Sequence, residues 1–260
     1  MSAILTVRDL EKTFGSVVAA RDISVSVPVE QTVGIIGANG AGKTTFVNMI
    51  TGHLKPSKGT IRFEDKDITG MPSRVITRLG ISRSFQVAQV FPSMTVADNM
   101  RMASAIARGK DSIIDRMLQP LDAPENAAEA DAGIELFRIA PYRESRAATL
   151  PQGVRKLLDI AMAVAGSPRL LLLDEPTSGI SVEEKFGLME VVMSALKVRK
   201  MTVLFVEHDM DIVARFADRV LAFYDGTVIA DGKPDVVLSN AEVQTLISGA
   251  PRTPRAATHA

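Results

Sequence analysis

The sequence predicts an α/β fold: a three-layer core around a mostly parallel sheet, with an antiparallel β subdomain and an inserted helical subdomain. Three observations carry this prediction. A glycine-rich loop lies between a strand-like and a helix-like segment within residues 32–52. Apolar runs typical of buried strands alternate with helical patterns after residue 166. The stretch between these regions, about residues 86–165, has no strand signals of its own.

Composition restricts the possible functions. The 260 residues are 46% hydrophobic, enough for one sizeable core or for a core plus a smaller subdomain. Thirty Lys and Arg balance thirty Asp and Glu, so the chain has no basic field to hold nucleic acid or an anionic membrane surface. The absence of cysteine excludes disulfides, thiolate nucleophiles and Cys-ligated metals. His53, His208 and His259 are too few for a His-rich metal site.

Neither a membrane-spanning segment nor a secretory signal is expected from the sequence. No apolar run approaches the roughly 20 residues needed to span a bilayer. The N-terminal stretch MSAILTVRDLEK is too charged for a secretory signal. We therefore expect a cytoplasmic protein whose membrane role, if it has one, is mediated by a protein partner.

The N-terminal residues predict a small antiparallel sheet. Residues 4–8 and 23–27 alternate apolar and polar side chains, as half-exposed strands do. Between them, Phe14 adjoins a turn expected at Gly15. Residues 60–63 (TIRF) predict a further strand, and His53 before it is expected on the surface without a role.

The glycine-rich loop GANGAGKTT, residues 37–45, is the feature around which the core is predicted to be organised. It follows the strand-like run TVGII, precedes a helical pattern, and fits the phosphate-loop motif G-x-x-x-x-G-K-[ST]. Glycines let successive N–H groups turn towards an anion at a helix N-terminus. Lys43 can neutralise phosphate oxygens and the Thr44 hydroxyl can ligate Mg²⁺. The residues expected to bind nucleotide here are Gly37, Asn39, Gly40, Ala41, Gly42, Lys43, Thr44 and Thr45. This assigns the α/β core to the phosphate-loop NTPases.

The inserted region begins after a short strand expected at residues 79–85, which ends at Gln86. Residues 95–107 predict a helix, with Thr95 and Asp98 as an N-terminal cap. Residues 119–129 are rich in Pro, Ala and acids and predict an exposed link between helices.

The second half of the chain returns to β structure. Residues 169–175 (RLLLLDE) contain four successive leucines, which predict a strand buried on both faces of a parallel sheet. The elements expected after it are a helix at 182–197, a strand at 202–206, a helix at 211–216 and a hairpin at 220–230 around an Asp-Gly turn. Residues 250–260 predict a disordered tail.

Acidic residues follow the leucine strand at the point where a phosphate-loop protein needs them. Asp174 could hold Mg²⁺ directly or through water, and Glu175 could polarise an attacking water. His208 ends the next buried strand and could reach the same place. Taken alone, a histidine in this position is more often structural.

The order of these motifs carries a family resemblance. GANGAGKT, then Gln86, LPQGVRK, LLLLDEPTSG and VEHD resemble the ATP-binding cassette family over residues 4–249. The stretches ISRSFQVAQVFPSMTVADN and DGKPDVVLSNAEVQTLIS are similar to ATPase subunits of branched-chain amino-acid-type importers. The resemblance implies a single cassette at residues 1–249, with its core at 1–85 and 166–249 and its helical subdomain at about 86–165.

The resemblance also implies a role for each motif. Phe14 matches the aromatic residue that stacks on adenine, Gln86 the Q-loop glutamine that touches Mg²⁺, and His208 the switch histidine. The implied catalytic residues are Lys43, Glu175 and His208, and the implied Mg²⁺ ligands are Thr44, Gln86 and Asp174. ATP and Mg²⁺ are the implied cofactors.

The family signature LSGGQ aligns with Leu150, Pro151, Gln152, Gly153 and Val154, and the D-loop with residues 178–181. In the family this signature closes over the γ-phosphate bound to a partner subunit. Pro151 here lacks both the usual serine hydroxyl and an N–H group. Thr149 and Gln152 could form a capping box, so a helix is still expected to begin here.

The function implied is ATP hydrolysis that powers uptake of branched-chain amino acids or a related small polar solute. Separate transmembrane permease subunits would dock near Phe85, Gln86 and Phe91. The other partners would be a second ATPase subunit, heterologous or a second copy, and indirectly a solute-binding protein. No nucleic-acid partner is expected, and the location would be the cytoplasmic face of the membrane.

Three alternatives stay open on the sequence. The chain could serve a lipid or polysaccharide exporter, because cassette sequences resemble each other across substrates. It could be a soluble cassette acting on DNA or ribosomes, although the neutral charge and the lack of a coiled-coil insertion or second cassette disfavour this. Pro151 also motivates a subunit that binds nucleotide without hydrolysis, which Lys43, Glu175 and His208 argue against.

Overall fold

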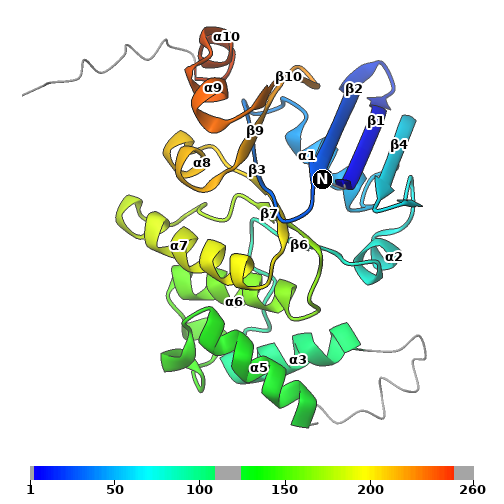
Figure 1. Ribbon diagram of the computed structural model, residues 1–260. Helices are drawn as coiled ribbons and strands as arrows, with labels where there is room; N and C mark the ends of the chain where they lie inside the picture. The colour runs from blue at the N-terminus through cyan, green and yellow to red at the C-terminus, as the bar shows by residue number, and fades with distance from the viewer. Residues whose placement is uncertain (1–2, 109–123, 249–260) are drawn as a thin grey trace, which may run out of the picture.

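The computed structural model describes residues 3–108 and 124–248, which form two sheets with helices between and beside them (Figure 1). The antiparallel sheet has the order β2-β1-β4-β5, and the larger sheet the order β10-β9-β3-β8-β7-β6. The strands of the first are β1 (Ala3–Phe14), β2 (Val17–Pro28), β4 (Lys58–Phe63) and β5 (Lys66–Asp67). The strands of the second are β3 (Thr32–Gly37), β6 (Ile81–Ser84), β7 (Leu170–Asp174), β8 (Thr202–Val206), β9 (Arg219–Tyr224) and β10 (Thr227–Gly232).

The larger sheet is parallel from β9 to β6, and β10 joins its edge antiparallel to β9. The α/β class with a separate antiparallel sheet is thus confirmed. The helices of the core are α1 (Lys43–Ile50), α2 (Ser73–Arg78), α6 (Gln152–Val164), α7 (Val182–Val198), α8 (Met210–Phe216), α9 (Pro234–Ser239) and α10 (Ala241–Val243), followed by a π-helical turn η3 (Gln244–Ser248). The sequence did not predict helix α2, strand β5 or the elements after β10.

Strand β7 shows how the larger sheet is stabilised on both faces. Leu170 and Leu172 pack in one hydrophobic cluster, which includes side chains of the antiparallel sheet and of α1. Leu171 and Leu173 pack in the other, which includes α6, α7 and α8. Because successive side chains of a strand point to opposite faces, a continuous apolar run is what a doubly covered strand requires. The prediction of a strand buried on both faces is confirmed.

Two hairpins confirm the turn predictions. β1 pairs with β2 around Gly15, whose φ of 59° lies in the left-handed region. Both strands are longer than the sequence pattern indicated, because their ends run beyond the alternating residues. β9 and β10 are joined by Asp225 and Gly226, with φ of 44° and 74°. Two successive positive φ values are the geometry of a type I′ turn, which favours an Asp-Gly pair.

The inserted region contains α3 (Val96–Arg108), α5 (Pro124–Leu136) and the short 3-10 turns η1 (Ala140–Tyr142) and η2 (Ala147–Thr149). In Figure 1, α3 and α5 lie below α6, at the end of the molecule away from the antiparallel sheet. The predicted cap of α3 is present, since the Asp98 amide donates to Thr95 Oγ1 at 3.1 Å. Residues 86–95 are not helical, so the helices of the inserted region begin later than the predicted start at residue 86.

Two predictions in this region are wrong. Residues 124–129 begin α5 and are not an exposed link, because alanines and a proline at the helix start favour helix there; residues 119–123 and 250–260 lie outside the described residues. The capping box at the start of α6 is also absent. Thr149 Oγ1 donates instead to the Arg146 carbonyl at 2.9 Å, within η2, and Pro151 takes the cap position without a side-chain hydrogen bond. The helix itself forms as expected.

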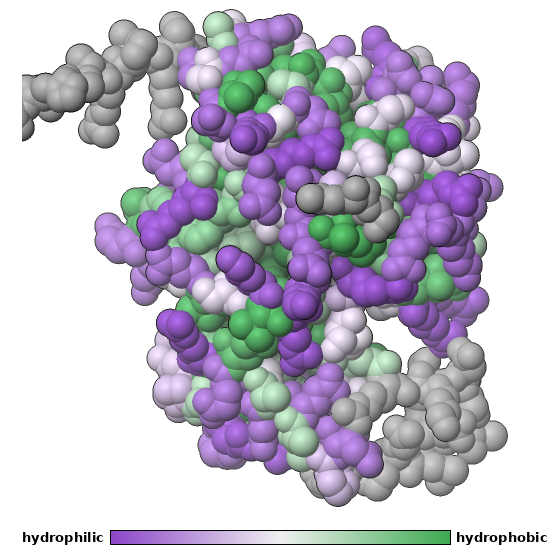
Figure 2. Space-filling model, viewed as in Figure 1, coloured by the Kyte–Doolittle hydropathy of each residue, from purple (hydrophilic) through white to green (hydrophobic). Residues whose placement is uncertain are grey.

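The surface in Figure 2 is covered mostly by polar side chains, with apolar side chains gathered in small separate patches. Among the helices within residues 3–108 and 124–248, none combines the length and apolar character needed to cross a membrane.

Candidate active site

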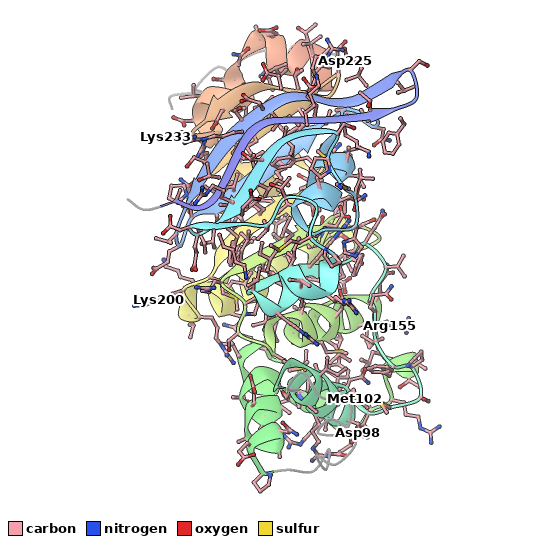
Figure 3. All side chains as sticks on the ribbon, turned by 90° about the vertical axis from the view of Figure 1, so that its right-hand side faces the viewer. Asp98, Met102, Arg155, Lys200, Asp225 and Lys233 are labelled. Carbon is pink, nitrogen blue, oxygen red and sulfur yellow. The ribbon has the colours of Figure 1, made fainter. Side chains whose placement is uncertain are left out.

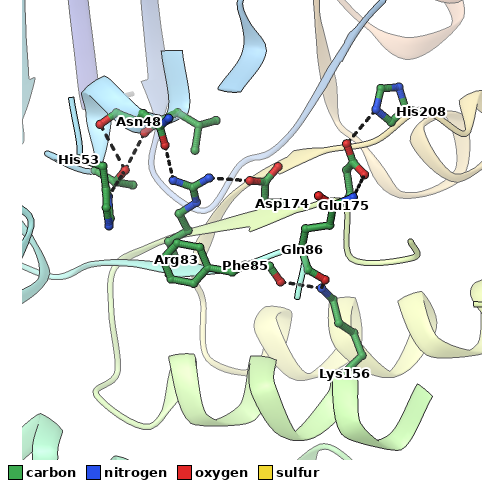
Figure 4. Close-up of polar contacts among 11 residues, drawn as sticks. Asn48, His53, Arg83, Phe85, Gln86, Lys156, Asp174, Glu175 and His208 are labelled. Atoms are coloured by element: carbon green, nitrogen blue, oxygen red, sulfur yellow. Dashed lines mark hydrogen bonds and ion pairs between the residues drawn. The ribbon is translucent and has the colours of Figure 1, made fainter. Parts of the chain in front are cut away.

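Four neighbouring parallel strands bring the predicted residues to one edge of the larger sheet. In the order β3, β8, β7 and β6, their carboxyl ends lead into the glycine-rich loop, His208, Asp174 with Glu175, and Gln86. Carboxyl ends of parallel strands open on the same side of a sheet, which is where ligands bind in open α/β folds. Gln86 and His208, which are far apart in the sequence, thereby both contact Glu175 (Figure 4).

The glycine-rich loop leads into α1 through glycines with positive φ, a backbone conformation that is strained for other residues. Gly42 caps the helix with φ of 98°, and a Cβ there would lie 2.8 Å from the Ala19 carbonyl oxygen of β2. Gly40 has φ of 81°, but a Cβ there would meet no atom within 4 Å. One glycine thus allows close packing against the antiparallel sheet, and the other lies on the open side of the loop, where an anion can approach.

Lys43 folds back over this loop. Its side chain is 6% exposed, and Nζ donates to the carbonyl oxygens of Gly37 at 2.6 Å and Ala38 at 3.0 Å. Burial lowers the pKa of Lys43, while the charges of Glu175 and Asp174 act in the opposite direction. The ammonium group therefore lies beside two main-chain oxygens and near two acids, in a place suited to a phosphate. The adjoining Thr44 is exposed.

The Glu175 carboxylate is held between two side chains that the sequence analysis singled out. His208 Nε2 lies 2.9 Å from Glu175 Oε1, and Gln86 Nε2 donates to Glu175 Oε2 at 2.8 Å. The Glu175 main chain has φ of 48° and its amide donates to the Val206 carbonyl of β8. The local turn therefore fixes the carboxylate next to the strand that ends in His208.

Arg83, which the sequence analysis did not consider, holds Asp174. Its guanidinium donates to Asp174 Oδ2 at 2.5 Å and to Asn48 Oδ1 of α1 at 2.6 Å. It also lies 4.9 Å from the centroid of the Phe85 ring, which forms a T-shaped pair with the exposed His53. An arginine inside the short strand-like run ISRSF was the available signal, since a buried cation in a strand requires a carboxylate or other acceptors.

Glu207 is a second residue that the sequence analysis missed. It is 3% exposed and accepts hydrogen bonds from the amide and hydroxyl of Thr177, at 2.9 and 2.7 Å, and from the His208 amide at 3.2 Å. Burial raises the pKa of Glu207, and these hydrogen bonds oppose the shift. The residue connects the end of β8 with the turn after β7, and so fixes the backbone on which His208 and Glu175 stand.

Phe14 lies apart from this cluster, at the end of β1. Its side chain is 51% exposed, and Lys12 Nζ lies 5.0 Å from the ring centroid. The ring is thus available at the tip of the antiparallel sheet, whose strand β2 contacts the glycine-rich loop at Gly42.

The segment aligned with LSGGQ lies at the start of α6. Pro151 and Gln152 are exposed, and a Cβ at Gly179 would lie 2.3 Å from Gln152 Nε2, so this segment touches residues 178–181 of the same chain. Arg155 (Figure 3) braces the turn before the helix by donating to the carbonyls of Ala147, Ala148 and Leu150 at 3.0–3.2 Å.

Comparison with known proteins decides the family. The ABC transporter family model matches residues 20–178, from β2 through the glycine-rich loop and the LSGGQ-like segment to the turn after Glu175. The chain belongs to the ABC transporter family. This ABC protein is an ATPase subunit, which confirms the fold class and the activity expected from its motifs.

Several curated ABC proteins are similar over nearly the whole chain. The high-affinity branched-chain amino acid transport ATP-binding protein BraF of Pseudomonas aeruginosa is 32% identical over 246 residues, covering 92% of this chain and 95% of that protein. LivG of Escherichia coli, of the same description, is 31% identical over 244 residues, with the same coverage. A probable branched-chain amino acid transport ATP-binding protein LivG of Archaeoglobus fulgidus is 34% identical and covers 95% of this chain and 96% of its own.

Solved structures of ABC proteins agree with this fold. The ADP conformation of MJ1267, an ATP-binding cassette of an ABC transporter, superimposes with a TM-score of 0.83 at 30% identity, covering 96% of this chain and all of that one. The structure of cbiO1 from Clostridium perfringens, part of the ABC transporter complex cbiONQ, gives a TM-score of 0.80 at 28% identity. It covers 94% of this chain and 93% of its own.

Proposed function

We propose that this chain hydrolyses ATP to power uptake of branched-chain amino acids, or of a related small polar solute, through separate membrane subunits. The relatives described as branched-chain amino acid transport ATP-binding proteins support the substrate class, because their similarity extends over more than nine-tenths of the chain. The similar segments include residues on both sides of the helical region, so the proposal does not rest on the phosphate loop alone.

The single observation that carries the mechanism is the Glu175 carboxylate between Gln86 and His208. In the proposal, Glu175 accepts a proton from the attacking water while His208 keeps the carboxylate oriented. Lys43 exchanges its two carbonyl partners for phosphate oxygens when nucleotide binds, which is favourable because hydrogen bonds between charged groups are stronger.

Mg²⁺ is proposed to bind with the nucleotide. The side chains of Thr44, Gln86 and Asp174 offer a hydroxyl, an amide carbonyl and a carboxylate oxygen, and a magnesium ion prefers such oxygen ligands. When bound, the ion would neutralise charge on the phosphates. Arg83 already holds one oxygen of Asp174, so this carboxylate would reach the ion through its other oxygen or through water.

Nucleotide is proposed to lie between Phe14 and the glycine-rich loop. The exposed Phe14 ring offers a stacking surface for adenine, and the residues that would hold the phosphates are Gly37, Asn39, Gly40, Ala41, Gly42, Lys43, Thr44 and Thr45. The positive φ of Gly40 and the free space beside it support this placement.

A second ATPase subunit is proposed to complete the opposite site. The signature segment, residues 150–154, would face the nucleotide of that partner, and the exposure of Pro151 and Gln152 is compatible with such a contact. Pro151 supplies neither hydroxyl nor N–H to a phosphate. We therefore propose an asymmetric dimer with a related but different subunit, in which the site facing Pro151 is the weaker.

Membrane subunits are proposed to dock beside the loop after β6, against the helical region of residues 86–165. Val87 is 73% exposed and Phe91 is 40% exposed, so apolar side chains are available there. The chain would then lie at the cytoplasmic face of the membrane, and a solute-binding protein would act on it indirectly through the permease.

The test is co-purification of the chain with its membrane and ATPase partners, followed by ATP turnover in lipid with candidate solutes. We expect branched-chain amino acids, amides or urea, delivered with the binding protein, to raise turnover several-fold. Isolation with an exporter of lipid or polysaccharide, or turnover that responds to none of these solutes, would contradict the proposed transport function.

A further inference from the structure

Two side chains of α6 hold the loop that carries Gln86. Lys156 Nζ donates to the carbonyl oxygens of Phe85 at 2.7 Å and Gln86 at 3.0 Å (Figure 4). Asp159 Oδ1 accepts from the Gln89 amide at 2.7 Å. The main chain is therefore fixed on both sides of Val87, while the Gln86 side chain remains directed at Glu175.

The next part of the loop is also held by the helical region. Asn99 of α3 is fully buried, accepts from the Phe91 amide at 2.7 Å and donates to the Phe91 carbonyl at 3.1 Å. Helix α3 in turn packs against α6. The position of the loop from Phe85 to Phe91 thus depends on these helices.

Both α6 residues are charged groups that are buried, and such burial lowers stability unless hydrogen bonds or ion pairs compensate for it. Lys156 is 4% exposed and Asp159 is 5% exposed. Burial lowers the pKa of Lys156, and the neighbouring acids Asp159, Asp174, Glu207 and Glu175 raise it. Burying an ammonium group is costly unless it keeps its hydrogen bonds. Lys156 therefore stays bound to the carbonyls of Phe85 and Gln86, and this holds the loop main chain in place.

The same helix begins at the signature segment. Gln152 is its first residue, Lys156 follows after about one turn, and Asp159 comes three residues later on the same face. A helix segment of this length moves as one body, so a displacement of its N-terminus is passed to the loop.

We propose that Lys156 and Asp159 are positioning residues, which place Gln86 for hydrolysis by attaching its loop to the helix that begins at the signature segment. Contact of the signature segment with a partner's nucleotide would then shift α6 and change the position of Gln86 in this chain's own site. This inference rests on the proposed roles of Gln86 and of the signature segment.

Kinetics of the assembled transporter test the first part. Lys156→Met removes the donors and the charge but keeps an unbranched chain, whereas Lys156→Arg keeps both. We expect Lys156→Met to lower kcat about tenfold or more, since small misplacements of catalytic groups have effects of that size, and to leave KM for ATP within about twofold. Lys156→Arg should recover most of kcat, and the exposed Lys197→Met should resemble the unmodified chain.

Fluorescence of the full chain tests the attachment itself. The sequence has no tryptophan, so Val87→Trp introduces a single reporter in the loop. In this background Lys156→Met should lower the anisotropy of Trp emission, and Lys156→Arg should not. If Lys156→Met does not fold, the pair Asp159→Leu and Asp159→Asn replaces it, because asparagine keeps an acceptor for the Gln89 amide and leucine does not.

Gln86→Ala separates the two levels of the proposal. If Gln86→Ala leaves kcat unchanged, the proposed role of Gln86 fails and this inference fails with it. If Gln86→Ala lowers kcat but Lys156→Met and Asp159→Leu do not, only the inference is overturned. Equal loss of kcat in Lys156→Met and Lys156→Arg, or loss with unchanged anisotropy, would overturn it as well.

Discussion

The guanidinium of Arg83 lies 2.5 Å from Oδ2 of Asp174, in an ion pair whose side chains are 8% and 15% exposed. The pair joins adjacent strands β6 and β7 at the edge of the sheet where the candidate active-site residues meet. Removing one partner of a buried pair leaves an uncompensated charge, which costs more than the intact pair contributes.

Arg83→Met is therefore expected to lower the free energy of unfolding by about 3 kcal/mol or more. The double variant Arg83→Met with Asp174→Asn should regain part of this loss, because no buried charge is left alone. Urea denaturation of the four proteins in the cycle measures the coupling. Losses that simply add in the double variant would contradict the importance of the pair.

Glu175→Gln should bind ATP with near-normal affinity and hydrolyse it roughly 10²- to 10⁴-fold more slowly, because glutamine cannot accept the proton of the water. Radiolabelled ATP retained after filtration, together with phosphate release, checks both parts. Glu183→Gln, an exposed glutamate of α7, is the matched control. Normal turnover by Glu175→Gln would mean that another residue activates the water.

Pro151→Ser should raise ATP turnover of the assembled transporter about tenfold or more, because a restored hydrogen bond to a charged phosphate is worth about 1.5–3 kcal/mol. The control is Pro234→Ser, which makes the same exchange at the start of α9, away from the signature segment. Unchanged turnover in Pro151→Ser would refute the weaker site proposed to face this residue.

Glu207 should give stability a specific pH dependence. Burial raises its pKa above the ordinary value of 4.5, so the folded state holds this proton over a range where the unfolded state has lost it. Its contribution is therefore fully present below pH 4.5 and is lost as pH rises through the folded pKa. The unfolding free energy of the unmodified chain minus that of Glu207→Gln should fall across this range. A difference that is flat, or that rises with pH, would show that the carboxyl is not destabilised by burial.

The sequence was sufficient for the elements whose signals are local. A pattern of only a few residues was enough to identify four elements: the glycine-rich loop, the leucine strand, β8 and the Asp-Gly hairpin. The convergence of Gln86, Glu175 and His208 could also be expected, because parallel strands end at one edge of a sheet.

The supporting residues were missed because their partners are distant in sequence, although an arginine inside a strand-like run was a signal for one of them. Lys156 reaches a carbonyl 71 residues away, and Arg83 reaches a carboxylate 91 residues away. Their side chains look like ordinary surface charges until the fold buries them. The failed capping box has a different cause: Thr149 finds a nearer acceptor in its own 3-10 turn.

The leucines of β7 couple the unfolding of the two hydrophobic clusters. Leu170 and Leu172 belong to one hydrophobic cluster and Leu171 and Leu173 to the other, so the two clusters share a wall. Neither cluster can unfold without exposing leucines of β7 to water. We expect the described core to melt in a single cooperative transition, with calorimetric and van't Hoff enthalpies that agree.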